Sequence, residues 1–336
     1  MRRRDVTAAP ASVEAPTRWW IDRSRSAYLA RRLLRLVVSL MLLLTITFAM
    51  IHLVPGDPVR TALGATAPAQ LVKQRRAQLG LDKPIWQQYA DYVDRAVHGD
   101  FGTSLTSGEP VSEIVGTRLP TTLRLAGLSF LVAVLVGVPL GILGAALTRG
   151  GRRRYTELAF TTATGTFASI PSFLLAVALI YLFGIHWRVF PVAEESGVSS
   201  YVLPIAALAI GPAAALARIV RVEGLKVLEQ DYIRTARGKR LPARLIYLRH
   251  ALPNMLTATL TISGLLLGGL IAGTVLIETI FAWPGLGGTL VSSVIDKDYP
   301  TVQAIALIFG ALILLINFVV DVLLSAIDPQ STILEW

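Results

Sequence analysis

The 336-residue sequence contains no cysteine and little charge: 16% of its residues are charged, whereas 53% are hydrophobic. The missing cysteine excludes disulfide frameworks, thiolate metal sites and cysteine nucleophiles. The charged fraction lies well below the quarter or so that is typical of soluble domains. The apolar residues are gathered in long blocks, so we expect a single domain in a membrane and no separate soluble domain.

Motifs for hydrolytic chemistry are missing as well. The sequence has no GxxxxGK[ST] phosphate loop, no GxSxG elbow and no HExxH helix. The four histidines lack an HxxxH or HxH spacing, so we expect neither a metal site nor a cofactor on this chain. We therefore do not expect the chain to be an enzyme on its own, and any energy that it uses must come from another protein.

Six apolar blocks are long enough to cross a bilayer, because a span needs about 20 predominantly apolar residues. The blocks lie at 31–53, 120–147, 157–184, 203–220, 256–282 and 302–325, and the fourth is the shortest. They predict an all-α integral membrane protein with about six transmembrane helices.

The remaining segments predict a simple domain outline. Residues 1–27 contain Arg and Pro without apolar periodicity, which favours a disordered tail ahead of an uncleaved anchor. Residues 54–119 carry apolar side chains at helical spacing and predict a small helical cap outside the membrane. The transmembrane domain is then 28–330, and 331–336 form a short second tail.

The net charge of +10 is explained by the placement of Lys and Arg beside the spans. Basic residues cluster before the first span, after the second, and between the fourth and fifth, whereas the other short loops carry only Arg188 and Lys297. By the positive-inside rule, both termini and the 221–254 loop are cytoplasmic and the 54–119 cap is extracytoplasmic. The charge therefore indicates a multi-pass protein of the cell membrane, in contact with lipid and not with nucleic acid.

One cytoplasmic segment, 229–241, is more informative than the others. Tyr232, Ile233 and Ala236 fall on one face of a predicted short amphipathic helix, and two arginines flank that face. Such a helix suits the groove of a partner protein. On periodicity alone, an ordinary basic loop on the cytoplasmic side remains the alternative.

Short motifs follow one another along most of the chain. They are H-L-V-P-G-D-P at 52–58, G-D-F-G-T-S at 99–104, R-L-P-T-T-L at 118–123, D-Y-I-R-T-A-R at 231–237, R-H-A-L-P-N at 249–254, E-T-I-F at 278–281, P-G-L-G at 284–287 and D-Y-P-T-V-Q at 298–303. From about residue 30 to 330 their order resembles the first permease subunit of the dipeptide and oligopeptide ABC importers. The 231–254 part resembles the cytoplasmic EAA motif of that family.

This resemblance implies the type I ABC importer permease fold and a role as a pore subunit. It implies four kinds of partner: a second homologous permease, two cytoplasmic ATPase domains that carry ATP and Mg, an extracytoplasmic binding protein, and a peptide substrate. The residues that it implies in ATPase contact are Asp231, Tyr232, Ala236, Arg237, Arg240 and Leu241. Arg240 stands where the family usually has glycine, so we expect a locally different turn there.

Polar side chains within the membrane blocks are functional candidates by default. Glu278, Asn317 and Asp321 are such residues. Each also has a structural interpretation: Glu278 could bind the backbone of the following turn, Asn317 could join helices, and Asp321 could lie near arginines at the inner interface.

Other functions remain as alternatives at this point. A permease for nickel or another small solute fits the same motifs. A secondary transporter also shows broken helices and polar residues in the membrane, but it usually carries both halves of an inverted repeat, and no repeat is visible here. A membrane-embedded enzyme would need paired carboxylates or a Ser/His pair at one depth, and none is recognisable.

Overall fold

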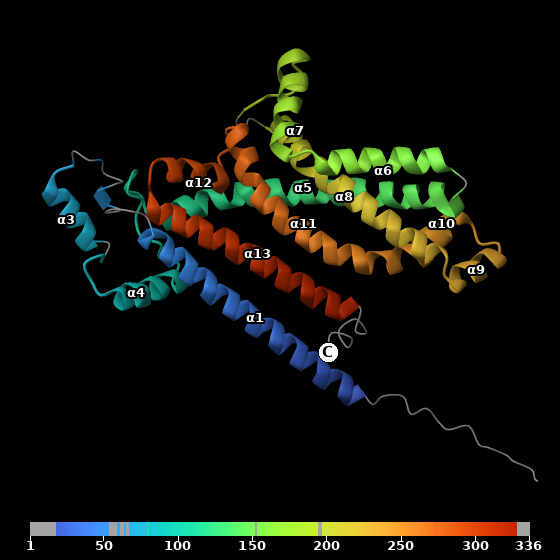
Figure 1. Cartoon of the computed structure of the whole chain (residues 1–336), viewed down its shortest axis with the longest axis horizontal. Helices are drawn as coiled ribbons and strands as arrows, with labels where there is room; N and C mark the ends of the chain where they lie inside the picture. Colours follow the sequence, from blue (N-terminus) through green and yellow to red (C-terminus); the bar gives the residue numbers. More distant parts are fainter. Residues whose placement is uncertain are drawn as a thin grey trace, which may run out of the picture.

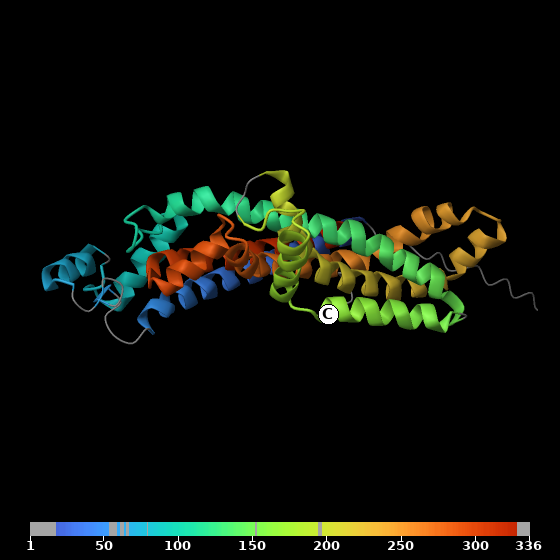
Figure 2. The same cartoon turned by 90° about the horizontal axis from the view of Figure 1, so that it is seen from above.

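A computed structural model describes residues 18–53, 59–60, 64, 67–78, 80–151, 153–193 and 197–327. Within these ranges every regular element is a helix, apart from an isolated bridge between Thr103 and Pro110. The long helices lie side by side in an elongated bundle, with short helices at its two ends (Figures 1 and 2). The prediction of an all-α protein is confirmed.

The centre of the bundle is the pair α5 (Val111–Thr148) and α8 (Val202–Leu228), which pack along each other. Their backbones approach closely at Gly141, where an added Cβ would lie 2.5 Å from the Cβ of Val220. α11 (Leu252–Ile280) and α13 (Tyr299–Ile327) pack beside this pair, and α1 (Arg18–His52) lies against α13.

Five helical stretches are long and apolar enough to cross a membrane: Tyr28–His52, Val111–Thr148, Val198–Leu228, Ser263–Ile280 and Tyr299–Leu323. The third of them contains the predicted fourth span. It is 31 residues long and extends beyond the apolar block 203–220 in both directions. The polar residues at its C-terminal end continue the helix, which hydropathy alone does not reveal.

The predicted span 157–184 is not a straight helix. It consists of α6 (Arg154–Ser169) and α7 (Ser172–Leu179), which runs on into η2 (Ile180–His186), and the two arms are bent by 93°. Pro171 lies at the bend, and Ile170 before it is extended, with φ −76° and ψ 121°. Proline disfavours helical backbone in the preceding residue, which explains the break.

A group of short helices lies at one end of the bundle, called the cap end here, and contains α3 (Ala69–Gln78) and α4 (Ile85–Val97) (Figure 1). The predicted helical cap is present, but α5 begins at Val111, so the cap is shorter than 54–119. α4 is held to α1 by hydrogen bonds of 2.9 Å that join the hydroxyls of Tyr89 and Tyr92 to those of Thr45 and Thr47.

The opposite end of the bundle, called the loop end here, carries α9 (Asp231–Gly238) and α10 (Ala243–Leu245), followed by the π-helical η4 (Ile246–Ala251) (Figure 1). The other short elements are η1 (Arg149–Gly151), η3 (Val198–Tyr201) and α12 (Leu286–Ile295). Helix α1 already begins at Arg18, inside the segment 1–27 that was expected to be disordered, because no Pro or Gly interrupts 18–52. Residues 1–17 and the predicted tail 331–336 lie outside the described residues.

Candidate functional site

Helix α9 follows α8 after only two residues and turns its apolar face toward its own chain. Ile233 and Ala236 are 0% and 6% exposed, and they pack in one cluster with Leu228 of α8, Ile246 of η4 and Met255 of α11. The expectation that Ala236 lies in a partner's groove is therefore wrong. The helix was predicted correctly, but its apolar side anchors it to the bundle.

The outward side of α9 carries its polar residues. Asp231 and Arg234 are exposed, and the 3.4 Å pair between them contributes little, because both side chains are in water. Tyr232 is 43% exposed, and its partial burial raises the pKa of the phenol above its usual value. Arg237 is half-buried. This face presents a phenol, a carboxylate and cationic groups at the surface.

The turn after α9 has the conformation that glycine normally provides. Arg240 adopts φ +54°, in the left-handed region. The N–H of Arg240 donates to the carbonyl of Arg237 at 2.8 Å, and the N–H of Leu241 donates to the carbonyl of Ala236 at 3.3 Å. This pair of bonds is the Schellman arrangement that ends helices. The expected different turn is thus not found, because Arg240 takes the left-handed position itself.

The six residues expected at the ATPase contact therefore divide into two groups. Ala236 and the partly buried Leu241 pack inward in the cluster of α8, η4 and α11. The other four lie toward the surface of the loop end: Asp231, Tyr232, Arg237 and Arg240.

Glu278 lies at the cap end of α11 and is fully buried. Its Oε2 accepts hydrogen bonds from the N–H groups of Gly287 at 2.6 Å and Gly288 at 3.2 Å, in the first turn of α12. The hydroxyl of Thr122 accepts the N–H of Leu286 beside them. Free N–H groups and the dipole of a helix N-terminus favour a carboxylate, so Glu278 holds α12 in place, as its structural interpretation predicted.

Asp321 lies near the end of α13 that is farther from the cap, and its Oδ2 is 2.9 Å from a guanidinium nitrogen of Arg32. Its predicted position near an arginine is confirmed. Asn317, one turn earlier on α13, is half-buried, and no hydrogen bond of its side chain to another described residue is found. The three polar residues therefore do not form one site.

A buried carboxylate that sequence reasoning did not single out joins the cap to α13. Asp298 is 2% exposed and accepts hydrogen bonds from the hydroxyls of Ser104 at 2.6 Å and Thr301 at 2.7 Å, and from the N–H of Leu105 at 2.9 Å. Ser104 and Asp298 both belong to motifs that support the family resemblance. The only sign of this contact in the sequence was that both motifs contain polar residues, although neither motif resembles a catalytic pattern.

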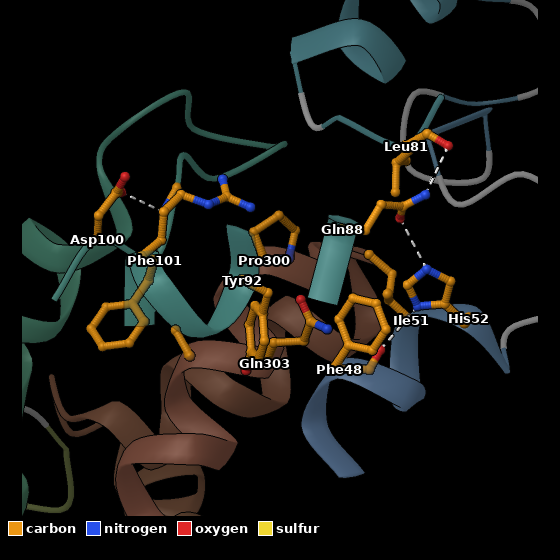
Figure 3. A pocket seen from close by; sticks show the side chains of 13 residues that line it. Phe48, Ile51, His52, Leu81, Gln88, Tyr92, Asp100, Phe101, Pro300 and Gln303 are labelled. Atoms are coloured by element: carbon orange, nitrogen blue, oxygen red, sulfur yellow. Dashed lines mark hydrogen bonds between the residues drawn. The ribbon is translucent and has the colours of Figure 1, made fainter. Parts of the chain in front are cut away.

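A small pocket of about 80 Å³ lies where the cap, α1 and α13 meet (Figure 3). Phe48 and His52 come from α1, Gln88 and Tyr92 from the cap, and Gln303 from α13. Nε2 of His52 is 3.1 Å from Oε1 of Gln88, and the amide nitrogen of Gln303 donates to the carbonyl of Thr47 at 2.7 Å. These contacts use polar groups of the pocket to hold helices together.

Larger cavities adjoin the bent span. One of about 500 Å³ lies between α5, α6 and α8 and is lined almost wholly by apolar side chains, among them Val136, Phe160 and Phe167. Another, of about 250 Å³, lies at the bend itself, beside Ile170 and Pro212. Their linings carry no acid, base or metal-ligating side chain.

Two family descriptions match the chain. "Binding-protein-dependent transport system inner membrane component" matches residues 137–332, and the corresponding N-terminal membrane component matches residues 26–126. The glutathione transport system permease protein GsiC of Escherichia coli K12 is 38% identical over 302 residues, which cover 90% of this chain and 97% of GsiC. GsiC of Salmonella typhi is 39% identical over the same length.

A solved structure shares the fold. A chain of the MetNI methionine ABC transporter, in a native crystal form with inward-facing conformations, superposes with a TM-score of 0.55 at 20% identity. The superposition covers 64% of this chain and 96% of that one. A second crystal form of the same transporter gives a TM-score of 0.54.

Proposed function

The chain belongs to the family of binding-protein-dependent transport system inner membrane components and is an ABC importer permease. We propose that it acts together with a second, homologous permease to import short peptides of the glutathione class. GsiC, its relative, is the permease of a glutathione transport system, and the alignment runs through nearly the whole of both chains. In this proposal two ATPase domains bind in the cytoplasm, and an extracytoplasmic binding protein delivers the peptide.

The proposed contact with the ATPases rests on one observation. α9 is pinned by Ile233 and Ala236 to the ends of α8 and α11, while Tyr232 and Arg237 lie on its outer side. A short helix that is fixed on one side and polar on the other transmits the movement of a partner to the spans behind it. The residues proposed for the contact are therefore Asp231, Tyr232, Arg237 and Arg240.

The orientation belongs to the proposal as well. With the basic loop end in the cytoplasm, both chain termini are cytoplasmic and the cap faces outward, and the distribution of Lys and Arg supports this orientation. The domain outline follows: a cap of roughly 54–110 outside, a coupling loop of about 229–251 between α8 and α11 inside, and the membrane spans between these two ends.

Uptake and ATP hydrolysis, measured with the complete transporter in vesicles, test this function. Radiolabelled glutathione and a dipeptide are the probes, and both permeases, the ATPases and the binding protein are present. We expect ATP-dependent uptake, and we expect Tyr232→Ala and Arg237→Glu to lower it about tenfold while the permease still inserts. Uptake that needs an ion gradient and no ATP would contradict the proposal.

The matched control for these substitutions is Glu223→Gln. Glu223 pairs with Lys226 at 2.8 Å on the last turns of α8, and the pair lies outside the proposed contact. We expect normal uptake with this variant. Normal uptake with both α9 variants would remove the ATPase contact from the proposal and leave the peptide assignment standing.

A further inference from the structure

A buried arginine joins three helices at the loop end. Arg221 of α8 is 5% exposed, and its Nε donates to the hydroxyl of Thr148, at the end of α5, at 3.0 Å. Another guanidinium nitrogen donates to Oε1 of Glu157, in the first turn of α6, at 2.7 Å. The guanidinium also lies 5.8 Å from the centre of the Phe160 ring. Glu157 is 43% exposed, so one partner of the buried charge reaches water.

This arginine lies between the proposed ATPase contact and the bent span. Two turns separate Arg221 from Leu228, the last residue of α8, and α9 starts three residues later. α9 is fixed to α8 through Ile233, which packs in the same cluster as Leu228 and Val220. On its other side Arg221 holds the start of α6, the arm that borders the 500 Å³ cavity.

We propose that the pair between Arg221 and Glu157 makes α6 follow the movement of α9. Arg221 is a positioning residue in this proposal: it touches neither nucleotide nor peptide. The proposal rests on the function proposed above, since it needs α9 to be displaced by the ATPases.

An ion pair with a buried guanidinium is suited to a contact that must persist while the helices move. A buried guanidinium that loses its carboxylate is strongly unfavourable, so the two helices separate only at a high cost in free energy. Apolar side chains, by contrast, can slide past one another with a small change in contact. Phe160 also lies close to Gly144 of α5, where an added Cβ would be 2.7 Å from the ring, so α6 and α5 are in contact in the same region.

The absence of cysteine allows a direct test with pairs of spin labels on an otherwise native chain. Leu158→Cys on α6 and Lys239→Cys beside α9 are each paired with Leu315→Cys on α13; all three positions are exposed. Distances are measured by pulsed electron paramagnetic resonance in the complete transporter in nanodiscs, with and without Mg and the ATP analogue AMP-PNP.

We expect AMP-PNP to shift both distances in the native background. With Glu157→Gln the α9 shift persists, the α6 shift falls to less than half, and peptide uptake per ATP hydrolysed falls about tenfold, within the usual range of coupling between sites. Glu157→Asp, which keeps the carboxylate, restores the α6 shift in part. Glu223→Gln, which breaks an exposed pair on the same helix, leaves both shifts unchanged.

Each other outcome decides against the proposal. A full α6 shift in Glu157→Gln shows that α6 follows α9 without the pair. Should Glu157→Gln fail to assemble, Arg221→Gln breaks the same pair from the other side and leaves no unpaired buried charge, and a full α6 shift in that variant has the same meaning. If α9 does not shift in the native background, both the ATPase contact and this proposal are wrong. If α9 shifts and α6 still shifts fully in Glu157→Gln, only this proposal is wrong.

Discussion

Oδ2 of Asp298 accepts a hydrogen bond of 2.6 Å from the hydroxyl of Ser104, although 194 residues separate them in the sequence. This bond attaches the last part of the cap to the start of α13. We predict that Asp298→Asn destabilises the protein by about 2 kcal/mol, because the amide nitrogen cannot accept the donors that now point at the carboxylate. Thermal unfolding in detergent, together with limited proteolysis of the cap, measures the effect.

Asp296→Asn is the matched control for that prediction, since Asp296 is exposed and lies two residues before Asp298. It removes the same charge, and we expect less than about 0.5 kcal/mol of change. Equal effects of the two substitutions would show that net charge, and not the contacts of Asp298, governs the stability of the cap.

Arg240→Gly is predicted to stabilise the coupling loop by about 1 kcal/mol, because a side chain in the left-handed region is strained and glycine is not. The amides of α9 should then exchange with deuterium several-fold more slowly. Lys239→Gly removes the same charge at the neighbouring position, where φ is −76°, and should make exchange faster. Faster exchange in both variants would mean that the Arg240 side chain stabilises the turn by other contacts.

Gly287→Ala is predicted to destabilise the fold by about 2–3 kcal/mol, because the new Cβ would lie 2.5 Å from the Cα of Val275 and only 2.9 Å from the Glu278 carboxylate. Gly288→Ala, one residue later, meets nothing closer than 3.4 Å and should be nearly neutral. Melting temperatures of the two purified variants compare the positions. The prediction fails if Gly287→Ala melts with the native protein.

The contact between α4 and α1 is predicted to weaken at high pH. Burial raises the pKa of Tyr92 above its usual value of 10.0, although the hydrogen bond to Thr47 opposes the shift. A raised folded pKa gives stability that is complete below pH 10 and is lost as the pH rises through the folded pKa. Tyr92→Phe should remove this loss, whereas Tyr155→Phe, at an 88% exposed position, should not. Unfolding by denaturant at pH 8 and above pH 10 provides the comparison.

The sequence was sufficient to predict helices, because apolar blocks of span length have few other solutions in a membrane. It also predicted the short helix at 231–238 and the contacts of Glu278 and Asp321. It could not show which way the apolar face of that helix points: periodicity identifies a face but not its neighbour. Ala236 was therefore assigned to a partner when it packs on α8 and α11.

Other differences between the predictions and the structure also depend on contacts between residues that are far apart in the sequence. The 93° bend depends on Pro171 and also on neighbouring helices that pack against each of the two arms. Hydropathy does not distinguish such a bent pair of helices from one straight span. The contact between Asp298 and Ser104 depends on the packing of α13 beside the cap. Arg240 was misjudged because a preference for glycine at a turn is an energetic preference and not a prohibition.

Helix α5 has 38 residues, which corresponds to a length of about 57 Å, nearly twice the hydrocarbon thickness of a bilayer. At one end Val111 packs with Phe101 of the cap, and at the other Thr148 binds Arg221. One continuous helix thus reaches from the cap to Arg221 of α8 at the loop end. A tilt of about 10° about its middle would carry the two ends about 5 Å in opposite directions, so a displacement at one end of this helix is accompanied by an opposite displacement at the other.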